Sequence, residues 1–117
     1  MQIETKTSVD QISDIKSGHM TVLRFSGDIS SSSRAALIGS YETVNKSQPI
    51  LLDFSKVDYI NSSGIALVIQ MLMEASKNSQ KIAAFGLSPH FQKVFTMVGI
   101  TKYASLYPDE ATAKTSI

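Results

Sequence analysis

The sequence contains no cysteine and almost no net charge, and both absences narrow the classes of function. Without cysteine the chain can form neither a disulfide nor a thiolate metal site, which suits a reducing cytoplasm. Its 11 Lys and Arg and 10 Asp and Glu leave a formal net charge of +1. The basic residues are scattered, whereas neutralising nucleic-acid phosphates requires a basic patch. The sequence therefore argues against nucleic acid as a partner.

The sequence also lacks a long apolar run. Its most apolar segment, residues 65–73, is about half as long as a membrane-spanning helix. Residues 1–10 contain no apolar core of the kind that a signal peptide has. We therefore expect a cytoplasmic protein with no direct insertion into a membrane. At 117 residues, the chain is long enough to bury one core and too short for two.

Alternation of apolar and polar residues predicts several strands. Residues 1–10 are polar with weak alternation, which is typical of an edge strand or a loose arm, and residues 11–117 are expected to form a single domain. Two weakly alternating runs, ending at Ile15 and beginning at Met20, flank a turn at 17–19 and predict a hairpin. The apolar run 50–54 predicts a central strand covered on both faces. Shorter strands are expected at 81–87 and 105–107.

Helical spacing and capping residues predict the helices. A run of serines at 30–33 leads into a stripe formed by Leu37, Ile38, Tyr41 and Val44. Ser62 or Ser63 is expected to cap a long helix that ends near Lys77, with a core stripe of Ile65, Val68, Ile69 and Leu72. A third helix starts with a cap at Ser88 and Pro89 and stops at Gly99, and a last helical turn covers 109–114. The order of elements predicts an α/β fold, a sheet with helices packed on it.

The segment 61–64, Asn-Ser-Ser-Gly, is the most informative part of the chain. It places a hydroxyl group at the N-terminus of a helix, where backbone N–H groups and the helix dipole favour negative charge. Simple N-capping would also account for a serine in this position. The geometry nevertheless suits regulatory phosphorylation better than catalysis.

Three segments in order resemble the STAS domain family of bacterial anti-sigma-factor antagonists. Residues 22–29 are similar to the second strand and turn of that family, and residues 51–67 to the strand, loop and helix that carry its regulatory serine. Residues 86–108 fit its C-terminal helix and last strand. The resemblance implies a STAS-like mixed β-sheet of four to five strands with about four helices packed on it.

In that family a serine or threonine at the junction of loop and helix accepts a phosphate, so the resemblance assigns phosphorylation to Ser62 or Ser63. It implies a partner kinase or anti-sigma factor of the histidine-kinase-like ATPase type, which the unmodified domain binds and phosphorylation releases. A serine phosphatase would reset this switch, which acts in transcription regulation. The residues expected to bind the partner are Asp28, Ser30, Ser31, Ser32, Arg34, Asn61, Gly64, Ile65 and Leu67. A weak homodimer is compatible with the sequence.

Two positions depart from the family pattern and keep other functions open. Asn61 and Ser30 stand where the family commonly has Asp. They give weight to a non-phosphorylated STAS docking subunit of a lipid-transport ABC complex. A STAS regulator in a phosphatase and response-regulator pathway, unrelated to sigma factors, is the other alternative.

No pattern in the chain predicts catalysis, a metal or a cofactor. The string Asn-Ser-Ser-Gly-Ile does not match the Gly-x-Ser-x-Gly motif, and the six glycines are too dispersed for a phosphate-binding loop. His19 and His90 have no second ligand at a suitable spacing. Asp53, inside an apolar strand, has no partner base and is expected to face a sheet edge or to accept backbone hydrogen bonds.

Overall fold

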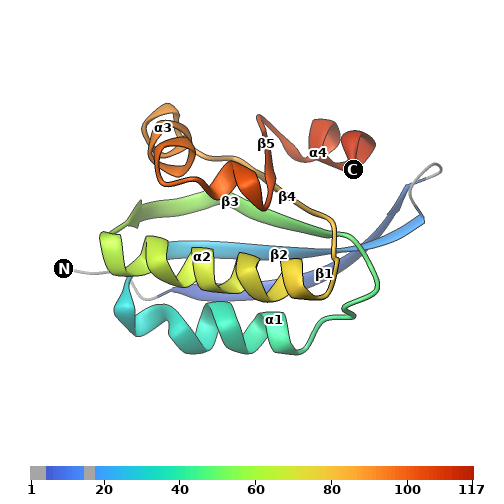
Figure 1. The fold of residues 1–117 in the computed structure, drawn as a ribbon, viewed down its shortest axis with the longest axis horizontal. Coiled ribbons are helices and arrows are strands. Elements are labelled where there is room, and N and C mark those ends of the chain that lie inside the picture. The colour runs from blue at the N-terminus through green and yellow to red at the C-terminus, as the bar shows by residue number, and fades with distance from the viewer. Residues whose placement is uncertain (1–4, 15–17) are drawn as a thin grey trace.

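A mixed sheet forms the centre of the computed structural model, which describes residues 5–14 and 18–117 (Figure 1). Within these residues the sheet has five strands in the order of the chain: β1 (Lys6–Asp14), β2 (Gly18–Ile29), β3 (Ile50–Ile60), β4 (Ile82–Phe85) and β5 (Ser105–Tyr107). β1 is antiparallel to β2, and the remaining neighbours are parallel. The α/β class and the mixed sheet are thus confirmed. The hairpin is also present, but Gly18 and His19 of the predicted turn belong to β2, where they pair with Asp14 and Ser13. Residues 15–17 lie outside the described residues.

Successive residues of the central strands alternate between two apolar clusters, one on each face of the sheet. Ile50 and Leu52 of β3 belong to the larger cluster, whereas Leu51 between them belongs to the smaller. This is the period of two that a pleated strand imposes. Residues 50–54 are buried on both faces, which explains why the run reads as continuously apolar.

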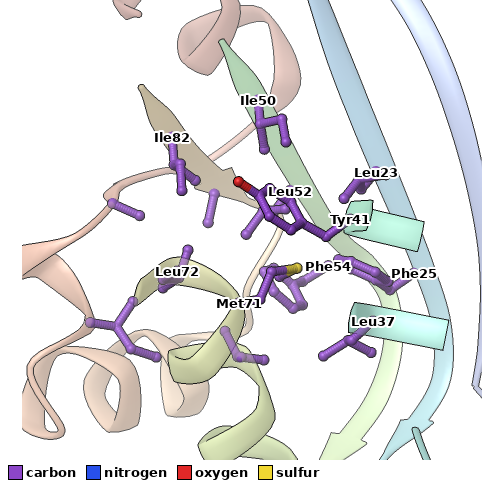
Figure 2. Close-up of a cluster of buried hydrophobic side chains, with 14 of the residues drawn as sticks. Leu23, Phe25, Leu37, Tyr41, Ile50, Leu52, Phe54, Met71, Leu72 and Ile82 are labelled. Carbon is purple, nitrogen blue, oxygen red and sulfur yellow. The ribbon is translucent and has the colours of Figure 1, made fainter. Parts of the chain in front are cut away.

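The larger cluster lies under most of the helical segments, and we call this side of the sheet the helical face. The segments are η1 (Ser31–Ser33), η2 (Ala35–Gly39), α1 (Ser40–Glu42), α2 (Ser62–Lys77), α3 (Pro89–Met97) and η3 (Ile100–Lys102). Figure 2 shows side chains of these segments pointing at the strands: Leu37, Tyr41, Met71 and Leu72 around Leu23, Phe25, Leu52 and Phe54. The ring centroid of Phe54 lies 5.5 Å from those of Phe25 and Phe95, so the aromatic rings join strands to α3.

The opposite side of the sheet, which we call the open face, carries the smaller cluster and is covered by α4 (Glu110–Ser116). Ala113 of this helix is fully buried there. Beyond α4 the open face becomes polar and is centred on Arg24. This guanidinium contacts carboxylate oxygens of Asp10 at 2.5 Å, Asp53 at 2.9 Å and Glu110 at 2.7 Å. One ion-pair cluster therefore joins β1, β2, β3 and α4.

Asp53 lies in the central strand β3, between β2 and β4, and so does not face a sheet edge. It is buried, and its Oδ1 atom accepts a hydrogen bond from the backbone N–H of Ser55 at 2.9 Å. The expectation that Asp53 accepts backbone hydrogen bonds is therefore confirmed, and the alternative of a sheet edge is wrong. Its Oδ2 atom pairs with Arg24. The carboxylate is therefore satisfied by structural contacts.

The segment after β2 is helical but irregular. Leu37, Tyr41 and Val44 of the predicted stripe are buried, while Ile38 is half-buried. Its first part is a 3₁₀ turn, its middle a π-helix and its end one α-helical turn. The hydroxyl of Ser40 donates to the carbonyl groups of Ala36 and Leu37, and such bonds compete with the α-helical ladder.

Helix α3 begins as the sequence predicts. Ser88 caps α3 by accepting a hydrogen bond from the Phe91 N–H at 3.3 Å, Pro89 opens the helix, and Gly99 follows it with a φ of 86°. In α2, Val68 and Leu72 are buried as expected, but the stripe is rotated. Its buried members are Gly64, Leu67, Val68, Met71, Leu72 and Ala75.

Within the described residues, no helix combines the length and apolar character needed to cross a membrane.

Candidate functional site

A single residue, Asn61, connects the end of β3 to the start of α2. Its backbone is extended, with φ of −86° and ψ of 177°, and its side-chain Oδ1 accepts a hydrogen bond from the Gly64 N–H at 2.8 Å. Its carbonyl accepts the first helical bond, from Ile65 N–H at 2.9 Å. Asn61 is therefore the N-cap of α2. The prediction that Ser62 or Ser63 caps this helix is wrong, because both serines already lie inside it.

Because Asn61 caps the helix, Ser62 and Ser63 occupy its first two positions and are both exposed. Their hydroxyl groups have no hydrogen-bond partner among residues 5–14 and 18–117. Their backbone N–H groups belong to the first turn, which no preceding helical carbonyl can satisfy. The dipole of this 16-residue helix adds partial positive charge at the same place. A phosphate on either hydroxyl would thus be electrostatically stabilised.

The end of β2 and the turn that follows it lie beside the serine pair. The Asn61 N–H donates to the carbonyl of Ile29 at 3.1 Å, which joins the ends of β2 and β3. Ser30 then caps η1: its hydroxyl accepts from the Ser32 N–H at 3.4 Å, and its own N–H donates to the Ser33 hydroxyl at 2.8 Å. In Figure 1, this turn after β2 lies next to the start of α2.

Arg34 holds the turn against α2. Its Nη1 donates to the Oε1 of Gln70 at 3.0 Å, and both side chains are exposed. Sequence reasoning identified Arg34 and missed Gln70, because the contact spans 36 positions along the chain. Helical spacing could have supplied the signal, since Gln70 lies two turns after Ser63 and so on the same side of α2.

The residues predicted to bind a partner differ in accessibility. Ser31, Ser32 and Arg34 are exposed. Asp28, Asn61 and Ile65 are half-buried. Ser30, Gly64 and Leu67 are buried, so these three can shape a partner-binding surface but offer it little side-chain area. We call the accessible set the serine surface: Asp28, Ser31, Ser32, Arg34, Asn61, Ser62, Ser63 and Ile65.

The polar side-chain groups of the serine surface are hydroxyl groups, one guanidinium, one carboxylate and the carboxamide of Asn61, whose Oδ1 is engaged in the helix cap. Within the described residues, no group of three or more His, Cys, Asp or Glu side chains is arranged to hold a metal ion. The surface combines two chain segments, 28–34 and 61–65, which the backbone hydrogen bond from Asn61 to Ile29 brings together. Its partner-binding role stays a prediction.

A protein-family model described as "Mlab, STAS domain" matches residues 12–108 of the chain. Among curated protein sequences, none matches the chain. Among solved structures, the chain is similar to an anti-sigma factor antagonist from Mycobacterium paratuberculosis, with 22% identity and a TM-score of 0.76. That likeness covers 97% of this chain and 94% of the other.

Two further structures extend the comparison. The anti-sigma factor antagonist SpoIIAA in its unphosphorylated form is 16% identical, with a TM-score of 0.64 and coverage of 93% of this chain and 96% of that one. A murine anion transporter of solute carrier family 26 is 12% identical, with a TM-score of 0.71; the likeness covers 99% of this chain and 22% of the transporter. At these identities the structures establish a shared fold.

Proposed function

The chain belongs to the STAS domain family, and on this premise we propose that it is a regulatory binding module switched by phosphorylation of Ser62 or Ser63. The unmodified serine surface would bind a serine kinase or anti-sigma factor of the histidine-kinase-like ATPase type, and a serine phosphatase would reverse the modification. The observation that carries the proposal is the exposed serine pair in the first turn of α2, without hydrogen-bond partners in the described part of the chain.

The switch would act on the surface and leave the fold intact. A phosphate adds about −1.5 to −2 charges at neutral pH, and the N-terminus of a helix tolerates them. The cap of α2 does not depend on either hydroxyl, because Asn61 supplies it. Modification therefore removes no structural hydrogen bond that the serines make within residues 5–14 and 18–117. Bulk and charge would instead obstruct a partner that docks across both segments of the serine surface.

The test has two parts. Intact-mass analysis after incubation with ATP and a candidate kinase encoded beside the gene should show one added phosphate, mapped by fragmentation to Ser62 or Ser63. In pull-downs with the same kinase, Ser62→Ala/Ser63→Ala should bind constitutively, and Ser62→Asp/Ser63→Asp should lose binding. Ser76→Asp, an exposed site in the last turns of the same helix, is the control and should bind like the wild type. Equal binding by all forms would contradict the switch.

A second function is favoured by two observations. The cap of α2 is an uncharged amide, and the matching family model carries the description "Mlab, STAS domain". Both favour a docking subunit of a lipid-transport ABC complex in which the serine surface is a fixed interface. This alternative predicts no added phosphate, together with binding to an ABC ATPase subunit that Ser62→Ala/Ser63→Ala leaves unchanged.

A further inference from the structure

A row of three polar residues crosses the open face of the sheet, on the side away from α2. In the strand registers, Lys6 of β1 pairs with Ser26 of β2, and Ser26 pairs with Lys56 of β3. Residues directly opposite one another in paired strands present their side chains on the same face, with Cβ atoms about 5 Å apart. The row therefore places one lysine ammonium group on each side of the Ser26 hydroxyl. We call it the Lys–Ser–Lys row.

The row lines a cleft of about 680 Å³. Its far wall is formed by the segment that leads into α4, and the lining includes Pro108, Asp109 and Glu110. Arg24 and Asp53 also line the cleft, and they form the pair that precedes Ser26 and Lys56 in the register of β2 and β3. The cleft thus has a cationic end at the row and an acidic end near α4.

The charge at the cationic end is not neutralised within the protein. The Arg24 charge is shared by three carboxylates, those of Asp10, Asp53 and Glu110. In contrast, neither Lys6 nor Lys56 forms an ion pair with any residue that the structure describes. The hydroxyl of Ser26 likewise has no hydrogen-bond partner there. Two positive charges and a free donor therefore face the same space.

An irregularity in β3 brings Lys56 into the row. The register moves from the pair Arg24 and Asp53 to the pair Ser26 and Lys56, so β3 carries one extra residue at this point. Without that residue, Lys56 would alternate onto the helical face. The bulged Ser55 is fixed by hydrogen bonds from its N–H and hydroxyl to Asp53 Oδ1, at 2.9 and 2.5 Å. Bulges of this kind re-aim side chains beside binding sites.

The neighbouring strand supports the bulge by close contact. Gly86, which follows β4, has a φ of 82°, and a Cβ atom added to it would lie 2.7 Å from the backbone nitrogen of Ser55. Only glycine fits both the conformation and the space. The position of Lys56 is therefore built into the backbone.

We propose that the Lys–Ser–Lys row binds a phosphomonoester group. The dianion matches the two lysine charges, and its oxygens can accept hydrogen bonds from both ammonium groups and from the Ser26 hydroxyl. The rest of the cleft, with Asp109 and Glu110 opposite, would hold the polar body of a small phosphorylated molecule. This site is on the opposite face from the serine surface, and it stands whether or not Ser62 or Ser63 is phosphorylated.

The probe for the test is glycerol 3-phosphate, added to ¹⁵N-labelled protein at constant ionic strength, because exposed charge pairs are screened by salt. We expect saturable shifts of the amide signals of residues 6, 26 and 56. Lys6→Gln/Lys56→Gln should raise the dissociation constant about tenfold or more, since it removes both charge-assisted donors. The matched control is Lys81→Gln/Lys102→Gln, which removes two lysines from a separate cleft of about 380 Å³. It should change the constant less than about twofold.

Two sources of the phosphomonoester can be distinguished. Binding to vesicles of phosphatidic acid in phosphatidylcholine, lost in Lys6→Gln/Lys56→Gln, would identify a lipid headgroup as the ligand. Binding of glycerol 3-phosphate without vesicle binding would identify a soluble metabolite, and both results support the site. Equal weakening of binding by the two double variants would overturn the phosphomonoester site. So would the absence of both a saturable shift with glycerol 3-phosphate and binding to the vesicles.

Discussion

Gly64 and Ile29 are in backbone contact where α2 meets the end of β2. A Cβ atom on residue 64 would lie 2.3 Å from the Ile29 carbonyl oxygen and 2.7 Å from its carbonyl carbon. Both obstructing atoms are backbone atoms, so the clash could be relieved only by moving a strand or the helix. The same carbonyl accepts the Asn61 N–H, so this contact sets how closely the serine pair approaches η1.

Gly64→Ala should therefore destabilise the domain, by roughly 1–3 kcal/mol if it behaves like other overpacked sites. Urea denaturation followed by circular dichroism would measure the change. Gly39→Ala is the matched control, because an added Cβ there meets no described atom within 4 Å and the residue has helical dihedral angles of −62° and −43°. It should be neutral or stabilising by up to about 1 kcal/mol. Equal losses in both variants would show that the contact with Ile29 is unimportant.

The capping role of Asn61 predicts a clear order of stability among variants. Asn61→Ala should cost about 1 kcal/mol, since it removes the acceptor for the Gly64 N–H. Asn61→Asp should keep the cap and gain from the helix dipole above about pH 5. Ser62→Ala and Ser63→Ala should leave the unfolding free energy nearly unchanged, because neither hydroxyl has a partner in the described chain. A larger loss in Ser63→Ala than in Asn61→Ala would contradict this assignment.

The sequence was sufficient to locate the strands and the serine pair but not to choose the cap. Asn61, Ser62 and Ser63 are all good N-cap residues, and only backbone geometry shows which of them stays outside the helix. The choice matters for function, because a capping hydroxyl would be engaged, whereas a hydroxyl in the first turn is free to be modified. Sequence periodicity locates a helix well and its first residue poorly.

The open face was largely invisible to sequence reasoning. Arg24 contacts Glu110, which lies 86 positions away in the sequence, and no local sequence pattern predicts a contact of that range. The bulge at Ser55 is equally hidden, because the residues around it alternate no differently from a regular strand until the register is known. The rotated stripe of α2 has a related cause: Gly64 buries its bare Cα against Ile29, which sequence hydrophobicity does not predict.

The Arg24 cluster predicts strong asymmetry between single and double variants. Arg24→Met would leave the Asp53 carboxylate, whose side chain is only 9% exposed, without its cation. Removing one partner of a buried pair typically costs about 3–5 kcal/mol, and partial exposure of Arg24 should bring the loss to the lower end or below it. Arg24→Met/Asp53→Leu should recover a large part of this loss. Chemical denaturation of the wild type, of Arg24→Met, of Asp53→Leu and of the double variant would measure the coupling, and additive losses would contradict a coupled pair.

Arg24→Lys offers a test of geometry at the same position. Carboxylates of Glu110 and Asp10 hold the pKa of the Arg24 guanidinium above its ordinary value, so the group stays charged at every accessible pH. A lysine keeps the charge but cannot reach three carboxylates with a planar fork of donors. We expect Arg24→Lys to fall between wild type and Arg24→Met in stability. It should also increase hydrogen exchange in α4, because the bond from Arg24 to Glu110 ties the first turn of this helix to β2.

Asp109 predicts a pH dependence confined to α4. Hydrogen bonds from Thr112, the backbone N–H at 2.8 Å first among them, lower the pKa of this capping carboxylate below its ordinary value. A group whose folded pKa is lowered stabilises the fold fully above its unfolded pKa and loses that contribution as the pH falls through the folded value. Exchange protection of the Thr112 amide should therefore decline below about pH 4, after correction for the intrinsic exchange rate. Asp109→Asn keeps a cap that does not titrate, so its protection should show no such decline. An identical decline in both proteins would assign the effect to another group.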